Sequence, residues 1–378
     1  MRFLPAVAAV VALAAAASRA AAQDSVFGIR GLGFLDRSVS AKSAGLGGGF
    51  ALFDPAAALN PASLAAWHAT SGWAVAAGSD RTFDTGAGTS SLSATRFPVI
   101  GFAGVIGDRV VVAVTASDYL DRNWSVQQTD TVMPRGVPVV ASDRTQSLGG
   151  VTDLRMAMAY RATGVTLGIG MHVLTGSTTT SVNRQFPVDS SYTPFTQRQL
   201  TSYSGVGVSL GAIVSPTPKV VAGASVRFNG RLKASTSDTS ASVPMPVEVN
   251  GGVYYQPTAG VMLTTTVGYA GWGAAANALA ADSQARSRNV WSVGVGVEAS
   301  VLRVGRSAVP LRLGYRWRQL PFPSGSSPLS ESAVTGGFGF ETAGGRATVD
   351  LGFEGGSRTA GALSEGFLTA YLGLMIRP

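Results

Sequence analysis

Apolar and polar residues alternate one by one along much of the chain. The stretch from Val165 to Val173 reads VTLGIGMHV, and the stretch from Leu311 to Arg318 reads LRLGYRWR. A period of two places successive side chains on opposite faces of a β-strand, whereas a helix would scatter the polar residues around its surface. The pattern therefore predicts strands that carry one apolar face and one face of small or polar side chains.

Fourteen segments of the chain show this alternation. They are residues 70–79, 91–106, 109–119, 145–161, 165–178, 197–213, 219–229, 246–256, 260–271, 288–300, 309–318, 334–342, 346–355 and 367–377. Nearly all reach the roughly 9–11 residues that a tilted strand needs to cross a bilayer. An even number is typical of single-chain bacterial barrels. The number rests on reading 91–106 as one strand across Phe97-Pro98, although proline lacks a donor for the ladder.

The connections between these segments alternate between long and short. The short ones carry turn residues, such as Gly107-Asp108 and Thr163-Gly164, and the long ones are rich in Ser, Thr, Asp and Pro. Bacterial barrels place short turns on the periplasmic side and long loops outside. Residues 69–378 are therefore predicted to form an all-β, antiparallel transmembrane barrel of about 14 strands. Both chain termini are expected to be periplasmic.

Residues 23–68 do not fit the strand pattern. The segment is dense in glycine, and Asp54-Pro55 and Asn60-Pro61 each place a capping side chain before a proline at a first helical position. We expect a small N-terminal plug, made of an extended glycine-rich piece and two short helical turns. Its small residues would allow the backbone to pack closely against the barrel wall.

The stretch from Ser38 to Leu64 resembles the N-terminal signature of the FadL superfamily of outer-membrane proteins, which includes the PorV/PorQ-like branch. The shared pattern is a glycine-rich run, an Asp-x-Ala-Ala step and an Asn-Pro-Ala step. The matching plug motif comprises Gly45, Gly47, Gly48, Gly49, Asp54, Asn60, Pro61 and Ala62. The resemblance implies a barrel of 14 strands whose N-terminal segment folds back into the lumen as a hatch.

Two functions follow from the resemblance. In transport members it implies passage of small hydrophobic or amphipathic molecules through the barrel and out laterally through its wall. In the PorV/PorQ-like branch it implies a binding or scaffold barrel that serves a protein-secretion complex. The long connection from Leu120 to Arg144 and the basic charge would then supply docking surfaces on the extracellular side.

The first 22 residues are predicted to be an export signal. Arg2 supplies the positive region, Val7 to Ala17 are apolar but too short to span a bilayer, and Ala20-Ala21-Ala22 gives a small-x-small cleavage pattern. No later stretch reaches the roughly 18 uninterrupted apolar residues that a membrane helix needs. Export and alternating strands together favour the bacterial outer membrane, with its lipid as a partner.

Charge and cysteine content narrow the remaining classes. The chain has no cysteine, which excludes disulfides and thiolate metal sites. Its formal charge is +8, but the basic residues form no cluster and accompany no nucleic-acid motif, so no nucleic-acid partner is expected. The positive balance instead favours an anionic lipid surface or acidic partners.

Charged residues fall on the polar face of the predicted strands. By alternation the lumen carries Arg155, Arg161, Arg227, Arg312, Arg316, Arg318, Glu248, Glu298, Glu341, Asp350 and Glu354. One interpretation is an internal ion-pair network that braces the barrel and the plug. The other is a channel lining that selects an anionic or amphipathic ligand. The three arginines on the strand 309–318 are the best candidates for gripping a carboxylate, which suits the planar guanidinium.

Catalytic chemistry is not expected. Only two histidines exist: His172 should face the lumen, and His68 lies at the junction of plug and barrel. A membrane hydrolase would need a histidine and a serine paired on the lipid-facing wall. Two histidines without a nearby acidic cluster are also poor metal ligands. No catalytic residue, metal or cofactor is therefore assigned.

Overall fold

The structure is a computed structural model of the 378-residue chain. It describes residues 26–35, 39–84, 89–187, 191–279, 287–304, 307–323, 327–361 and 363–377. The predicted export signal, residues 1–22, lies outside these ranges.

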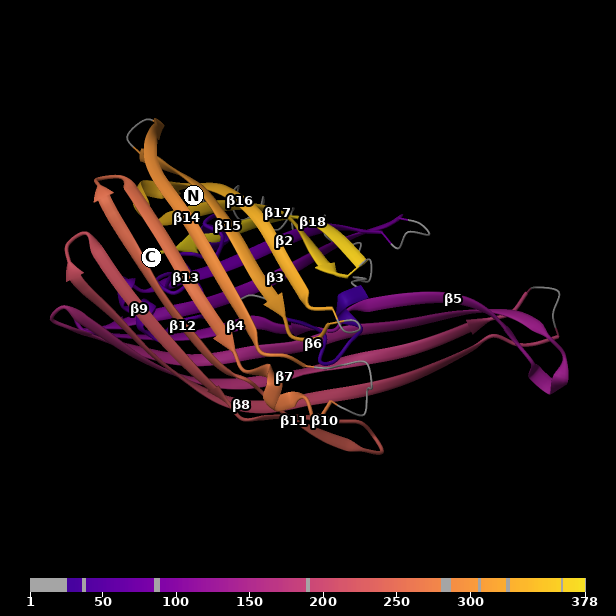
Figure 1. Ribbon diagram of the computed structural model, residues 1–378. Coiled ribbons are helices and arrows are strands. Elements are labelled where there is room, and N and C mark those ends of the chain that lie inside the picture. The colour runs from indigo at the N-terminus through magenta and orange to yellow at the C-terminus, as the bar shows by residue number, and fades with distance from the viewer. Residues whose placement is uncertain are drawn as a thin grey trace, which may run out of the picture.

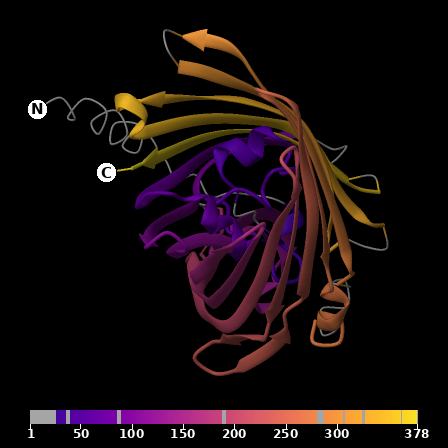
Figure 2. The same cartoon turned by 90° about the vertical axis from the view of Figure 1, so that its left-hand side faces the viewer.

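Fourteen of the described strands close into an antiparallel barrel (Figures 1 and 2). They are β2 (Ser71–Asp84), β3 (Thr89–Ile106), β4 (Val110–Asp121), β6 (Val139–Ala162), β7 (Val165–Gln185), β8 (Phe195–Thr217), β9 (Val220–Asn229), β12 (Val247–Thr258), β13 (Val261–Ala270), β14 (Val290–Val304), β15 (Ser307–Leu320), β16 (Leu329–Thr342), β17 (Ala347–Ala360) and β18 (Leu363–Ile376). The ring closes where β18 pairs with β2, from Ser364 opposite Asp84 to Ile376 opposite Gly72. The predicted all-β barrel is confirmed.

The strand across Phe97-Pro98 is continuous, as predicted. β2 and β3 pair on both sides of it, with Val75 opposite Val99 and Ala77 opposite Arg96, so that Ala76 alone faces the Phe97-Pro98 pair. Pairing of β3 with β4 begins only at Val99. The proline is therefore accommodated in a β-bulge, because the extra residue of a bulge does not have to donate a hydrogen bond to the neighbouring strand.

Several strands run further than the apolar alternation indicated. Only residues 85–88 separate the end of β2 from the start of β3 in the sequence. Only residues 361–362 separate β17 from β18. The prediction of long connections at these two places was wrong. The alternation ends where the wall stops being apolar, but the backbone ladder continues beyond that point because its hydrogen bonds do not depend on side-chain type.

Four further strands in the described ranges are not part of the ring of fourteen. β1 (Phe34–Leu35) pairs with the end of β4, and β10 (Arg231–Ser235) and β11 (Ser240–Pro244) form a hairpin. β5 (Trp124–Val132) pairs with β6. Loops were predicted where β5, β10 and β11 form, and that was wrong. Most side chains of β5 are exposed, so its sequence WSVQQTDTV lacks the alternation of apolar and polar residues that would have predicted a strand.

β5 and the long strands beside it project beyond the rest of the barrel, to the right in Figure 1. We call this part the extension. It consists of residues 124–132 of β5, 139–147 of β6, 177–185 of β7 and 195–201 of β8, which pair in that order.

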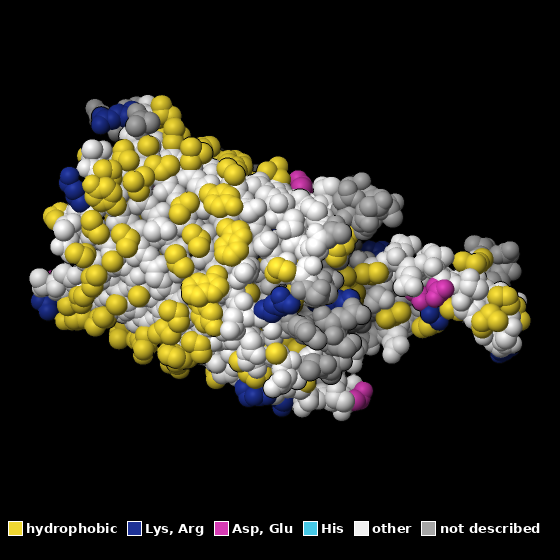
Figure 3. All heavy atoms as spheres, viewed as in Figure 1, with side chains coloured by type: hydrophobic (Ala, Val, Ile, Leu, Met, Phe, Trp, Pro, Cys, Tyr) yellow, Lys and Arg dark blue, Asp and Glu magenta, His cyan; other side chains and the backbone are white. Residues whose placement is uncertain are grey.

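The two faces of the wall differ sharply. Side chains that point outward are large and apolar, including Leu313 and Met156, which are 64% and 67% exposed. Figure 3 shows such side chains spread over the barrel wall, with charged ones near its ends and on the extension. Soluble proteins do not expose an apolar surface of this extent, whereas a lipid-facing barrel does. No helix in the described ranges is long and apolar enough to cross a bilayer.

Residues 39–67 lie inside the ring, and we call them the interior segment (Figure 2). The segment contains α2 (Ala41–Gly45) and the 3₁₀ helix η2 (Pro61–Ala66). α2 contacts β15 to β18, and η2 contacts β4 and β6 to β8. The turn predicted at Asn60-Pro61 is confirmed. At Asp54-Pro55 a turn forms instead of a helix, and the first helix is α2, capped by Ser40.

Candidate ligand cavity in the barrel lumen

The interior segment is held together by Asp54, which is 4% exposed. Its carboxylate accepts hydrogen bonds from the hydroxyls of Ser40 and Ser43 and, at 3.0 Å, from the backbone N–H of Ala56. The Ser63 hydroxyl donates to the backbone oxygen of Asp54 at 3.1 Å. Asp54 thus ties α2 to the turn that follows through its carboxylate, and to η2 through its backbone oxygen.

Glycine allows the interior segment to touch the wall backbone to backbone. Gly47 has a positive φ of 63°, and a Cβ built there would lie 2.5 Å from the backbone oxygen of Tyr315. On the wall, a Cβ at Gly314 would lie 2.4 Å from the backbone carbon of Leu46. The Gly49 oxygen accepts hydrogen bonds from the Thr264 and Thr266 hydroxyls, at 2.6 and 2.7 Å. The small residues on both surfaces therefore set the distance between segment and wall.

Two wall arginines bind the other half of the segment. Arg155 donates from Nη1 to the backbone oxygen of Ala58 at 2.8 Å, and Arg161 donates from Nε to that of Ala65 at 2.7 Å. The Asn60 side chain caps η2 by accepting from the N–H of Ala62 at 3.0 Å. Both lumen arginines thus bind main chain of the interior segment.

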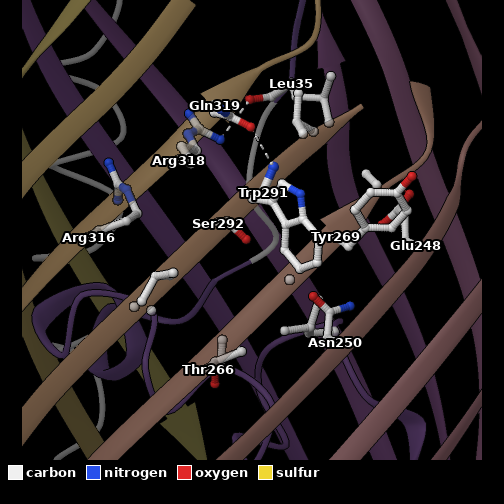
Figure 4. A pocket seen from close by; sticks show the side chains of 18 of the residues that line it. Leu35, Glu248, Asn250, Thr266, Tyr269, Trp291, Ser292, Arg316, Arg318 and Gln319 are labelled. Carbon is white, nitrogen blue, oxygen red and sulfur yellow. Dashed lines mark hydrogen bonds between the residues drawn. The ribbon is translucent and has the colours of Figure 1, made fainter. Parts of the chain in front are cut away.

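A cavity of about 220 Å³ remains between the interior segment and the wall (Figure 4). The segment and the preceding chain contribute apolar side chains, among them Leu35, Val39 and Leu59. The barrel contributes polar and charged ones, namely Tyr119, Arg227, Glu248, Asn250, Thr266, Ser292, Arg316, Arg318 and Gln319, together with apolar and aromatic ones such as Val290, Trp291 and Leu320. The lining therefore combines apolar side chains from both the segment and the wall with polar ones from the wall, which fits a small amphipathic or weakly polar molecule.

The three arginines of β15 face inward, and each is bound to acids. Arg312 contacts Glu298 at 2.7 Å and Asp350 at 2.5 Å. Arg316 contacts Glu331 and Glu354, each at 2.7 Å. Arg318 contacts Glu331, also at 2.7 Å. This geometry is that of an internal ion-pair network, the first of the two interpretations of the lumen charges.

The three candidate glutamates lie in different surroundings. Glu298 contacts Arg312 and, at 3.5 Å, Lys42 of the interior segment. Glu248 accepts from the Tyr119 hydroxyl at 2.9 Å on the wall of the cavity. Glu341 is exposed near the end of β16, so it does not join the lumen cluster. Only Glu248 of the three lines the 220 Å³ cavity.

His172 does have an acidic neighbour, contrary to the sequence-based expectation. Its Nδ1 lies 2.9 Å from Asp153, and its Nε2 lies 2.9 Å from the Ser209 hydroxyl. The order Asp–His–Ser is that of a hydrolase triad. However, all three side chains are at most 3% exposed, Asp153 also pairs with Arg227 at 2.7 Å, and Ser209 does not line the 220 Å³ cavity. The hydrogen-bonded side chains of Asp153, His172 and Ser209 therefore stabilise the wall of the barrel. In the described ranges no three metal-ligating side chains of the His, Cys, Asp or Glu type come together.

Sequence reasoning missed several other buried charges. Arg81, Glu331, Arg358 and Glu365 lie inside the barrel, each at most 5% exposed. All of them belong to the parts of β2, β16, β17 and β18 that extend past the predicted strand ends. The alternation of inward and outward positions could have identified them. Extending each predicted strand by a few residues and keeping every second position inward would have included all four.

No protein-family profile and no curated protein sequence matches the chain. Solved structures do match. Those that match include structures of a FadL homologue and of toluene transporters.

The chain is similar to a Pseudomonas aeruginosa FadL homologue, at 14% identity and a TM-score of 0.63, over 91% of this chain and 99% of that one. It is also similar to the Ralstonia pickettii toluene transporter TbuX, at 14% identity and a TM-score of 0.57, over 90% and 98%. The Pseudomonas putida toluene transporter TodX gives 15% identity and a TM-score of 0.54 over the same shares. The predicted FadL-like fold is confirmed.

Proposed function

We propose that the protein is a FadL-type channel of the bacterial outer membrane that takes up small hydrophobic or amphipathic molecules. The observation that carries the proposal is the 220 Å³ cavity between the interior segment and the wall, whose lining combines apolar and polar side chains. A cavity of roughly 150 Å³ is large enough to hold benzene. The size therefore favours molecules of about one ring or a short chain. The likeness to two toluene transporters supports the same class of ligand.

The interior segment is proposed to be the plug of this channel. Its residues touch strands around the ring, and Gly47, Gly49 and Asn60 of the motif are in direct contact with wall residues. We expect removal of residues 39–67 to convert the barrel into an open pore. Swelling of liposomes in a small sugar should then become much faster, while a mock deletion of the hairpin loop residues 236–239 leaves swelling unchanged. Equal swelling of the deletion and the intact protein contradicts the plug assignment.

The cavity assignment is tested by filling it. Asn250 lines the cavity, whereas its neighbour Val249 is 46% exposed on the outer face. Asn250→Trp should reduce the uptake of labelled toluene at least tenfold, and Val249→Trp should leave it unchanged. Folding of both variants is checked by the gel shift on heating that folded barrels show. If Asn250→Trp transports as the wild type does, the cavity is not on the path.

The scaffold function remains the second candidate, because the extension offers a surface beyond the apolar wall. Exposed apolar residues there include Val126, Val140 and Leu200. A partner protein of a secretion complex would be recovered with the intact chain from native membranes and lost when residues 124–147 are replaced by a short turn. Recovery of the barrel without any partner would contradict the scaffold function.

A further inference from the structure

A second cavity of about 40 Å³ lies against the inner wall formed by β2, β3, β15, β17 and β18. Five guanidinium groups line it, those of Arg81, Arg96, Arg316, Arg318 and Arg358. A volume of this size holds roughly three water molecules. Phe34 of β1 also lines the cavity, and the guanidinium groups of Arg81, Arg318 and Arg358 lie 4.3–5.7 Å from the centre of its ring.

Four of the five arginines contact carboxylates. Arg96 pairs with Asp121, and Arg358 pairs with Glu365. Glu331, which is 1% exposed, receives Arg316, Arg318 and Arg358, each at 2.7 Å. Arg316 also contacts Glu354 at 2.7 Å. Each of these four arginines therefore has at least one acid as a partner.

Arg81 is the fifth arginine, and no carboxylate of the described residues pairs with it. It is 5% exposed, and its Nε and Nη1 atoms have no hydrogen-bond partner among the residues that the structure describes. The Phe34 ring, 5.7 Å away, faces the guanidinium but cannot accept bonds from its N–H edge. A buried charge with unsatisfied donors is costly, and proteins normally supply a partner for it.

We propose that this cavity, which we call the Arg81 site, binds one anionic group of carboxylate size. The group would accept hydrogen bonds from Nε and Nη1 of Arg81, the planar fork that carboxylates match. Ser79 and Thr369 line the same cavity, and because Thr369 donates to Ser79 Oγ at 3.1 Å, the proton of Ser79 is left to donate.

Glu354 is the one acid in the lining, and its position does not oppose an anion. Its Oε1 accepts from Arg316 at 2.7 Å, and its Oε2 accepts from the Tyr371 hydroxyl at 3.2 Å. Both oxygens therefore face donors, which offset their charge within the cluster.

The anionic group has two possible sources. Arg316 and Arg318 line both the Arg81 site and the larger 220 Å³ cavity. A carboxylate at Arg81 is therefore either a free small anion or the end of an amphipathic molecule whose apolar part lies in the larger cavity. The site itself does not depend on transport, so its test is independent of the uptake assays.

The test measures thermal unfolding of the full-length folded protein in detergent micelles. Sodium acetate is titrated against sodium MES at constant ionic strength, because the bulky MES sulfonate does not fit a cavity of 40 Å³. The midpoint of unfolding should rise with acetate and level off, as for a ligand that binds only the folded state. Sodium hexanoate forms the second arm. Half-saturation at a tenfold lower concentration than acetate indicates the amphipathic source, and equal half-saturation indicates the free anion.

Three variants make the assignment specific. Arg81→Gln should abolish the response or weaken the half-saturation by at least tenfold, and Arg81→Lys should retain part of it. Arg184→Gln is the matched control, because Arg184 pairs with Asp143 on the extension, far from the site. Arg81→Gln should also unfold at a higher temperature than the wild type in MES, since it removes a buried charge that has no paired acid. A wild type that ignores both anions, or an Arg81→Gln variant that responds fully, overturns the proposal.

Discussion

At the scale of single residues, glycines determine the packing in the lumen as much as charged side chains do. Gly314 of β15 and Gly47 of the interior segment lie so close to the facing backbone that an added methyl group would meet its atoms at 2.4–2.5 Å. Asp54, in contrast, acts through its acceptors, which satisfy three donors of the interior segment. Both features make the position of the segment sensitive to single substitutions.

Gly314→Ala should loosen the contact between wall and segment. The new methyl group has no space, and overpacking of this kind costs about 1–3 kcal/mol. The free energy of unfolding, measured in urea from lipid vesicles, is expected to fall by that amount. Gly251→Ala is the control, because a Cβ at Gly251 meets nothing within 4 Å. Equal effects of the two changes would contradict the close contact.

Asp54→Ala should release the interior segment without opening the wall. Each buried donor left without a partner costs about 1–3 kcal/mol. Amide hydrogen exchange over residues 39–67 is expected to become at least tenfold faster, while the strands of the wall exchange as before. Asp80→Ala, which removes an acid hydrogen-bonded to the exposed Ser93 hydroxyl, provides the comparison. Unchanged exchange in Asp54→Ala would remove its role as the organising carboxylate.

At the scale of elements, each long strand has two parts with different environments. The first part carries outward apolar side chains over the barrel wall, and the second continues as a polar ladder, most clearly in the extension. The bulge at Phe97-Pro98 likewise shows that strand pairing does not depend on side-chain type. β2 and β3 pair on both sides of Pro98, which has no backbone N–H to donate.

Leu313→Arg should distinguish the two parts. Leu313 is 64% exposed in the middle of β15, and Leu200 is 57% exposed on the extension. An arginine facing lipid near the bilayer midplane costs about 2–4 kcal/mol, and close to zero outside it. The free energy of folding into phospholipid vesicles should therefore fall by that amount for Leu313→Arg and hardly change for Leu200→Arg. Similar losses in both would mean that the extension is also embedded.

At the scale of the whole molecule, the barrel has two unlike ends. The turns at Gly107, Gly164 and Gly260 lie at one end, which is also where β2 begins and β18 finishes. The extension and the hairpin of β10 and β11 lie at the other. We propose that the end with the short turns faces the periplasm, as in bacterial barrels generally.

Trypsin added to intact cells tests this orientation. Arg135 is exposed at the tip of the extension and has a positive φ of 53°, so it lies in an accessible turn. We expect cleavage after Arg135 in intact cells, and no cleavage in the variant Arg135→Gly. Lys219, in a short turn at the opposite end, should be cut only after the outer membrane is permeabilised. The reverse pattern would place the termini outside.

The ring of strands could be predicted from alternation alone, because lipid on one side and packed polar groups on the other impose a strict period of two. The same signal failed for β5, most of which is exposed, and for the ends of β2 and β17, where inward residues such as Arg81 and Arg358 stay buried but the outward side chains are no longer apolar. The plug motif was found from its glycines and the Asn60 cap. The partners of those glycines were not predictable, because Gly47 meets residues more than 200 positions away.

The amino-acid sequence by itself determined the barrel, its closure by about 14 strands and the presence of an N-terminal segment that is not a strand. These follow from local patterns, which are written in neighbouring residues. Only the tertiary structure decided which charges neutralise one another, that the arginines of β15 are already paired, and that Arg81 is not. Pairing across a lumen depends on which strands the ring brings face to face, and no local pattern contains that information.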